Sequence, residues 1–198
     1  WDPHTPYRTP ADWPNYFEDS PVDSWLTEDI YNEHKKMSSP HGVNEIGMFT
    51  DEENPKFPKH PGAIRNYGEL RRMFDGYDGG VRYADMLLGK IMDKMRDMGI
   101  YDDAVIILTS DHGENLGELG LYAEHATADN VTCRIPMIVK WPGCARGVDS
   151  EFHYSLDLAP TLCDMLGVKP SKWWDGQSYA DTLRTGEKQG RDYLVVSQ

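Results

Sequence analysis

The residues whose types could do chemistry lie directly after a short apolar run. Residues 105–109, VIILT, are apolar or β-branched, and SDHGE follows, so Asp111 and His112 stand side by side after a strand-like segment. In open α/β sheets, functional groups gather beyond the carboxyl ends of strands. A carboxylate and an imidazole can bind a divalent cation when other ligands join them. The alternative is that Asp111 caps the turn, His112 is a polar loop residue and Gly113 serves the turn alone.

Two further histidines stand in loops that could reach the same place. His125 lies in EHATADNVTCRIP (124–136), between two strand-like segments, so its loop can return to the sheet edge where Asp111 lies. His4 stands in WDPHTPY with a proline on each side, and prolines restrict the backbone that carries the imidazole. A single loop histidine is more often solvated than catalytic, so neither residue establishes a site by itself.

The segments that must position these groups combine helices and strands in an α/β order. Helical spacing of apolar residues predicts a helix from about Tyr67 and a longer stretch through Met98, continuous or broken at Gly79–Gly80, with its methionines in the core. Strands are predicted at 104–109 and 135–140, whose continuous apolar runs are typical of strands buried on both faces. This order predicts an α/β fold like that of a doubly wound sheet. Other expected elements are a short helix within 27–37 capped by Thr27, a loop over 38–63, a helix over 155–167 and a strand-like run over 191–198.

Composition limits the kind of partner. The 198 residues suffice for one domain with a core, and 39% apolar and 27% charged residues are ordinary for a globular protein. The net charge of −13 argues against nucleic acid and against an anionic membrane surface. No apolar run approaches the roughly 20 residues that span a bilayer, and WDPHTPY does not resemble a signal peptide. The three scattered cysteines, Cys133, Cys144 and Cys163, predict core packing and not a disulfide framework.

Five segments together resemble the sulfatase family of the alkaline-phosphatase superfamily, in order and in spacing. The segments are WDPHTPY, GVRYADMLLGKIMDKMRDMGIYDDAVIILTSDHGE, EHATADNVTCRIPMIVKWPG, LDLAPTLCDMLG and DGQSY. The strand with SDHGE, followed by R-x-P-x-I-V-x-W-P-G, is the most specific pair, whereas SDHG alone is shared across the superfamily. The resemblance covers most of the chain and is weakest over 20–65. It implies a mixed sheet flanked by helices, present as a partial domain: 1–167 as the second half of the catalytic α/β domain, and 168–198 as a linker and the start of the C-terminal subdomain.

The resemblance implies a role for each candidate residue. Asp111 and His112 match the acid and the adjacent Asn or His that bind a divalent cation, usually Ca²⁺, in the family. His125 lies nine residues before Arg134, where the family has a Lys or His that holds a sulfate oxygen. His4 matches a histidine of a Pro-rich loop that contacts the sulfate and the leaving-group oxygen, so it is the candidate general acid. His4 and His125 are therefore the expected catalytic and substrate-binding residues.

One part of the family's machinery is not in this sequence. Sulfatases use a formylglycine made from Cys or Ser in C/S-x-P-x-R, and CRIPM, CARGV and CDMLG do not fit that pattern. We therefore expect the chain to be a fragment of a sulfatase, inactive by itself, whose preceding segment supplies the formylglycine and further acidic metal ligands. The expected substrate is a sulfated small molecule or glycan, or an aryl sulfate. An apolar face left open by missing strands would favour a homo-oligomer.

Two other functions remain open at this point. A phosphonate monoester hydrolase or phosphodiesterase of the same superfamily would share the strand-SDHG pattern, and the nucleophile segment would discriminate it from a sulfatase. A non-catalytic fragment or binding module would keep only the fold, and a calcium titration would separate it from an enzyme. The compartment is also open, since periplasmic, extracellular and lysosomal locations are typical of the family and a cytoplasmic one is compatible with the sequence.

Overall fold

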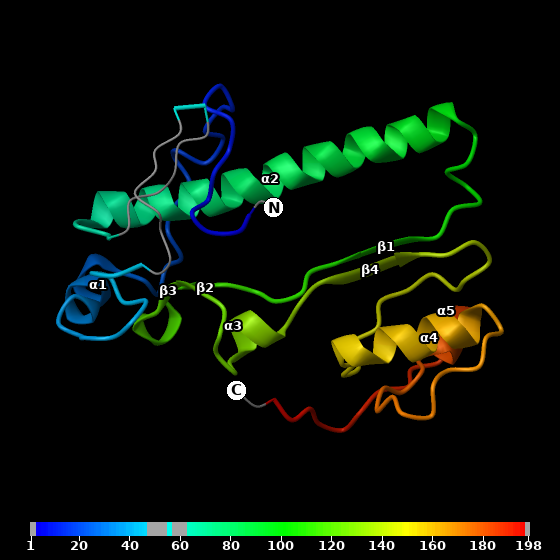
Figure 1. The fold of residues 1–198 in the computed structure, drawn as a ribbon. Coiled ribbons are helices and arrows are strands. Elements are labelled where there is room, and N and C mark those ends of the chain that lie inside the picture. The colour runs from blue at the N-terminus through cyan, green and yellow to red at the C-terminus, as the bar shows by residue number, and fades with distance from the viewer. Residues whose placement is uncertain (1–2, 47–54, 57–62, 197–198) are drawn as a thin grey trace. The chain divides into compact units, whose positions relative to one another are not determined.

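The chain is a mixture of helices and short strands (Figure 1). A computed structural model describes residues 3–46, 55–56 and 63–196. Among these residues no helix combines the length and apolar character needed to cross a bilayer. Two compact units are formed: unit 1 comprises Trp1–Gly99 and His112–Arg134, and unit 2 comprises Ile100–Asp111 and Ile135–Gln198. The elements are α1 (Glu28–His34), α2 (Tyr67–Asp97), β1 (Ile106–Thr109), β2 (Asn115–Leu116), η1 (Glu118–Gly120), β3 (Tyr122–Glu124), α3 (Asn130–Cys133), β4 (Met137–Lys140), η2 (Ser155–Asp157), α4 (Leu158–Met165) and α5 (Ala180–Thr185).

Helix α2 of unit 1 is continuous, so the predicted helix is not broken at Gly79–Gly80 (Figure 1). It begins after Asn66, whose side chain accepts a hydrogen bond from the Glu69 N–H at 2.9 Å. It ends before Gly99, which adopts a φ of +70° and is the predicted stop. Helix α1 likewise begins after Thr27, the predicted N-cap. The sequence therefore predicted where α1 begins and where α2 ends.

The core of unit 1 uses only the first half of α2. Leu70 and Met73 are fully buried there, whereas Ile91 is 59% and Met98 60% exposed. The prediction that the apolar positions of 81–98 form a core is therefore not met within unit 1, because the buried cluster of this unit and the residues packed against it involve α2 only between residues 67 and 77. The buried cluster consists of Tyr7, Leu26, Tyr31, Val43, Ile46, Ile64, Leu70, Met73, Tyr122 and Ala123.

The strands form two antiparallel pairs, β1 with β4 and β2 with β3. The two predicted strands are confirmed as neighbours, with Ile107 opposite Val139. Their antiparallel pairing differs from the parallel order of a doubly wound sheet. Ile138 is 61% exposed, so the prediction of strands buried on both faces is also wrong in this chain. Among the described residues no further strand lies beside this two-stranded ribbon, so apolar runs typical of buried strands remain partly open to solvent.

The C-terminal run does not form the predicted strand in its described part, residues 191–196. It makes one isolated bridge, between Arg191 and Phe152. Tyr193 and Val195 beyond that bridge are largely exposed. β-Branched and aromatic residues favour strands only where a partner strand is present to complete the ladder.

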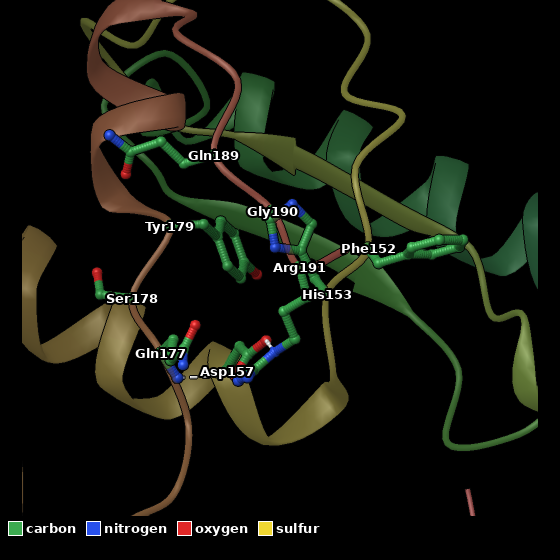
Figure 2. Close-up of a pocket in the computed structure, with 9 residues that line it drawn as sticks. All are labelled: Phe152, His153, Asp157, Gln177, Ser178, Tyr179, Gln189, Gly190 and Arg191. Carbon is green, nitrogen blue, oxygen red and sulfur yellow. Dashed lines mark hydrogen bonds and ion pairs between the residues drawn. The ribbon is translucent and has the colours of Figure 1, made fainter. Parts of the chain in front are cut away.

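A buried carboxylate organises unit 2 (Figure 2). Asp157 is 1% exposed and accepts bonds from the Arg191 guanidinium at 2.6 Å, the Gln177 N–H at 2.7 Å and the Tyr154 N–H at 2.8 Å. Burial raises the pKa of Asp157, but these donors outweigh it and hold the pKa below its usual value. Asp157 lies where η2 leads into α4, in the predicted 155–167 helix, so it ties this helix to the segments that follow it.

Candidate functional site

Gly113 lets the SDHGE segment pack closely against the backbone of residues 131 and 132. The Gly113 N–H donates to the Thr132 carbonyl at 2.8 Å, and a Cβ on Gly113 would lie 1.8 Å from the Val131 carbonyl oxygen. No other residue fits without a backbone shift. Gly113 is therefore more than a turn residue, because it allows the backbone between His112 and Glu114 to approach helix α3.

The backbone that carries His125 is held by the residue before it. The Glu124 carboxylate accepts the N–H of His125 at 2.8 Å and that of Ala126 at 2.6 Å, and His41 Nε2 lies 2.7 Å from its other oxygen. Burial raises the pKa of Glu124, but the two backbone hydrogen bonds and His41 lower it by more, so the net shift of the pKa is downward. Ala123 is buried with a φ of +54°, a conformation that non-glycine residues rarely adopt. The loop that presents His125 is thus fixed locally.

The N-terminal loop is anchored on α2 through Tyr7. A Cβ on Gly76 would lie 3.1 Å from the Tyr7 Cβ, so the absence of a side chain at Gly76 lets the loop approach the helix. The buried Tyr7 hydroxyl donates to Glu114 Oε1 at 2.7 Å. His4 Nδ1 lies 2.6 Å from the Thr5 carbonyl oxygen, which can only accept, so this nitrogen carries the proton. In the neutral ring, Nε2 then has the lone pair.

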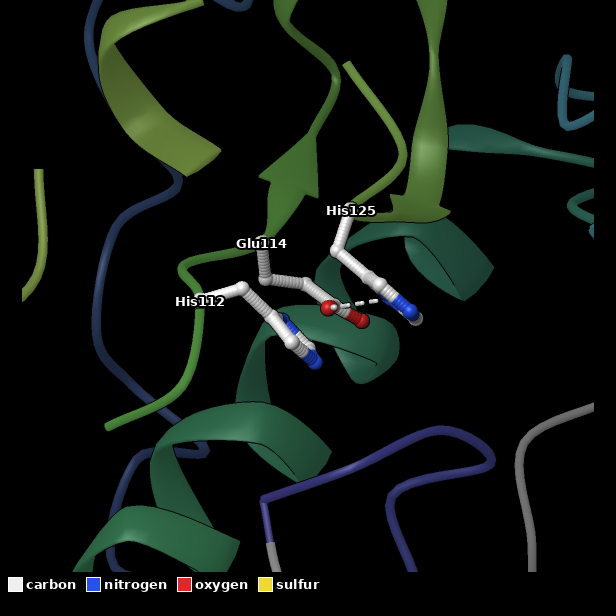
Figure 3. A group of neighbouring side chains, drawn as sticks. All are labelled: His112, Glu114 and His125. Carbon is white, nitrogen blue, oxygen red and sulfur yellow. Dashed lines mark ion pairs between the residues drawn. The ribbon is translucent and has the colours of Figure 1, made fainter. Parts of the chain in front are cut away.

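Three of the four predicted site residues gather in unit 1. The His112 and His125 rings are stacked, with centroids 3.8 Å apart and planes 12° apart, and the His4 ring centroid is 5.9 Å from that of His125. Glu114 lies beside the stacked pair, with Oε2 3.6 Å from His125 Nδ1 (Figure 3). Asp111, the fourth predicted residue, is exposed and belongs to unit 2. The structure therefore brings His4, His112 and His125 together around a carboxylate.

That carboxylate, Glu114, is the residue that the sequence reasoning did not single out. Its side chain is only 6% exposed. Burial raises its pKa, and the Tyr7 bond and the nearby imidazoles lower it, with a net upward shift. The sequence does contain an indication of its role. Glu114 follows His112 by two residues in SDHGE, so the two side chains are carried by the same short segment. Glu114 is the common neighbour of Tyr7 and the histidines.

The donor atoms of this group suit some metal ions better than others. His112, Glu114 and His125 each offer one ligand atom, and these atoms lie within 4.8 Å of one another. Calcium takes six to eight oxygen ligands, whereas two imidazoles and one carboxylate suit zinc and its neighbours in the first transition row. This group by itself therefore does not fit the predicted calcium ion, because two of its three donors are nitrogen.

Comparisons with known proteins show the family to which the chain is related. Residues 2–168 match the family model named Sulfatase. A sulfatase of Formosa agariphila is 28% identical over 199 aligned positions, which cover 98% of this chain and 36% of that protein. The chain thus spans about a third of that relative's length.

Two solved structures are similar in backbone as well. BT4656, in complex with its substrate D-glucosamine-2-N,6-O-disulfate, superposes with a TM-score of 0.58 at 25% identity, over 64% of this chain and 26% of that one. The phosphonate monoester hydrolase of Agrobacterium radiobacter superposes with a TM-score of 0.58 at 28% identity, over 69% of this chain and 28% of that one. Both likenesses support the sulfatase and alkaline-phosphatase-like fold.

Proposed function

The chain belongs to the sulfatase family, and from that membership we propose that it is part of a sulfuric ester hydrolase that removes sulfate from a sugar or aryl sulfate. We assign residues 1–167 to the second half of the catalytic domain and 168–198 to a linker and the start of a C-terminal subdomain. The observation that carries the proposal is that His4, His112 and His125, at positions matched to the family, converge in one group.

A sulfated sugar is the first substrate class to test. BT4656, whose fold resembles this chain, binds a disulfated glucosamine. The overall charge of −13 does not attract an anion, so recognition must be local to the pocket. The imidazoles of His4 and His125 are the groups we propose to contact the sulfate, because each can donate an N–H to its oxygens.

In the proposed reaction, a hydroxyl nucleophile attacks sulfur and the bond from sulfur to the ester oxygen breaks. His125 donates an N–H to a sulfate oxygen and stabilises the negative charge that builds up there. With both ring nitrogens protonated, His4 gives the proton on Nε2 to the leaving oxygen. The products are an alcohol and the sulfated nucleophile, from which sulfate must later be released. The formylglycine that the family uses would supply the nucleophile from a segment outside this chain.

We propose Asp111 and His112 as ligands of the family's divalent cation in the full-length protein. Calcium at that position would need further oxygen ligands, which we expect from a preceding segment. The Asp111→Ala variant should lower metal content and activity together, while His112→Asn should be tolerated because the family has Asn there. Metal analysis of the purified variants with rate measurements checks both, and an Asp111→Ala enzyme with normal metal content and rate would remove Asp111 from the site.

A phosphonate monoester hydrolase is the second candidate, because the Agrobacterium radiobacter enzyme of that type is 28% identical to this chain over the matched region. The two candidates share the fold and differ in the substrate they turn over. Paired assays of the full-length protein with a sulfate monoester and a phosphonate monoester separate them. A kcat/KM higher for the phosphonate would replace the first proposal with the second.

The roles of the two histidines are tested with His4→Ala and His125→Ala, each assayed on a sugar sulfate and on an activated aryl sulfate. Loss of a general acid should harm the sugar ester most, since a sugar alkoxide leaves poorly without a proton. Loss of a sulfate contact should harm both substrates alike. His153→Ala is the control, because His153 pairs with Asp149 in unit 2. Equal losses for His4→Ala on both substrates would contradict its acid role.

A further inference from the structure

We propose that His112, Glu114 and His125 form a binding site for one transition-metal ion of the zinc type, a ligand set different from Asp111 with His112. The three donor atoms lie within 4.8 Å of one another; His112 and Glu114 come from one segment of unit 1 and His125 from another. Binding requires only residues of this chain. It should therefore be observed whether the full-length protein hydrolyses sulfates, phosphonates or neither.

The first ligand, His112, is already set in the tautomer that a metal needs. Its Nδ1 lies 2.8 Å from the Gly113 carbonyl oxygen, which can only accept a hydrogen bond, so Nδ1 carries the proton. The lone pair of the neutral ring is then on Nε2. Histidines that bind metals commonly donate their other ring N–H to a backbone carbonyl in this way, which fixes the ring and raises its basicity.

The second ligand, Glu114, is oriented by Tyr7. The Tyr7 hydroxyl donates to Oε1 at 2.7 Å, so Oε2 is the oxygen directed at His125. Hydrogen bonding to the second oxygen is the usual support of a metal-binding carboxylate. With 6% of the side chain exposed, the charge lies in surroundings of low polarity, where a nearby cation is strongly attracted.

The third ligand, His125, has a buried nitrogen that makes no hydrogen bond within the described part of the chain. That atom is Nδ1, and Glu114 Oε2 is 3.6 Å away, beyond hydrogen-bonding distance. A buried polar atom without a partner calls for an ion or water beside it. A metal ion between Nδ1 and Oε2 would give both atoms a partner.

The site needs only side-chain movement to close. At zinc–ligand distances of about 2.0 Å, tetrahedral donors are about 3.3 Å apart, so the three atoms must approach. Because the His112 and His125 rings are stacked nearly parallel, one of them must turn out of the stack for both lone pairs to point at one ion. The His4 ring, 5.9 Å from that of His125, is near enough to supply a fourth ligand, and water is the alternative. If His125 holds the substrate anion as proposed above, zinc bound here would inhibit the full-length protein.

Isothermal titration of the metal-free chain with Zn²⁺ and with Ca²⁺ tests the site. We expect one equivalent of Zn²⁺ to bind at least about 100-fold more tightly than Ca²⁺. The His125→Ala and Glu114→Gln variants should each lose roughly 100-fold or more in Zn²⁺ affinity, and Tyr7→Phe about 10-fold, since supporting partners contribute less than ligands. Glu114→Gln keeps the size and shape of the side chain, so it reports on the ligand even where His125→Ala folds poorly.

Two controls address other ways of binding zinc. His153→Ala removes a histidine that lies beside a carboxylate outside the group, and Cys133→Ser removes an exposed thiol. Both should leave Zn²⁺ affinity within a factor of about two, because neither side chain belongs to the proposed site. Zinc affinity unchanged in folded Glu114→Gln and His125→Ala, or calcium bound more tightly than zinc, would overturn the proposal.

Discussion

Each unit of the chain contains a buried carboxylate, and the two have opposite surroundings. Asp157 in unit 2 receives a guanidinium and two backbone N–H groups, and its pKa is lowered. Glu114 in unit 1 receives a phenol hydroxyl and lies beside imidazoles, and its pKa is raised. Fixed donors that outweigh burial indicate a carboxylate that holds the fold together. A carboxylate whose burial is not fully compensated retains the capacity to bind a cation.

The largest effect should come from breaking the compensated carboxylate. In Asp157→Asn the amide leaves Arg191 without its counter-charge and places an N–H₂ against backbone donors. Removing one partner of a buried ion pair costs about 3–5 kcal/mol, so unit 2 should unfold far more readily. Urea denaturation gives the free energy, and hydrogen exchange locates the loss in unit 2. Asp164→Ala, which removes an exposed partner of Arg184, should leave stability close to that of the native chain.

The interaction between Asp157 and Arg191 should also be lost on acidification. The resulting decrease in the free energy of unfolding should be no larger than that caused by Asp157→Asn. Because the folded-state pKa of Asp157 is lowered, its contribution is fully present above the unfolded pKa, about 3.9, and disappears as the pH falls through the folded pKa. The difference in unfolding free energy between the native chain and Asp157→Asn should therefore be large at pH 7 and shrink below about pH 4. A difference that stays constant down to pH 2 would mean that the charge of Asp157 is not what stabilises unit 2.

A smaller loss of stability is expected from a substitution at Gly113, whose close backbone packing positions Glu114. In Gly113→Ala the new Cβ would collide with the Val131 carbonyl oxygen, so the segment that carries Glu114 must move. Overpacking of this kind costs about 1–3 kcal/mol, measured by urea denaturation, and should weaken zinc binding as well. Gly89→Ala is the matched control: it lies within α2 with no atom near the new Cβ, so it should stabilise by about 0.4–1 kcal/mol. Equal behaviour of the two variants would contradict the packing role of Gly113.

The comparison also separates what the sequence could predict from what it could not. His4, His112 and His125 were predicted because each stands in a motif whose residue types and spacing are visible in one dimension. Glu114 was not, because its importance depends on burial and on Tyr7, which is 107 positions away in the chain. Asp157 could be placed in a helix but not recognised as a buried partner of Arg191 for the same reason.

The fold divides in a similar way. Helix ends were predictable because Thr27, Asn66 and Gly99 act locally through capping and backbone conformation. The burial of 81–98 and of the strands was not, since apolar periodicity shows which face can be covered and not whether another segment covers it. The expected homo-oligomer, which would cover such a face, stays a prediction.

The smallest effect on stability is expected from Glu114→Gln, which, like Asp157→Asn, replaces a buried carboxylate with an amide. Glu114→Gln keeps the length of the side chain and an oxygen that can accept from Tyr7, and it removes a charge that burial disfavours. The lost attraction to the imidazoles opposes that gain, so the free energy of unfolding should stay within about 1 kcal/mol of the native value at pH 7. Zinc affinity should nevertheless fall sharply, because the ligand oxygen is no longer charged. Urea denaturation beside the Asp157→Asn variant measures the contrast. If Glu114→Gln were as destabilising as Asp157→Asn, both carboxylates would hold the fold, and the difference between the two units would lie elsewhere.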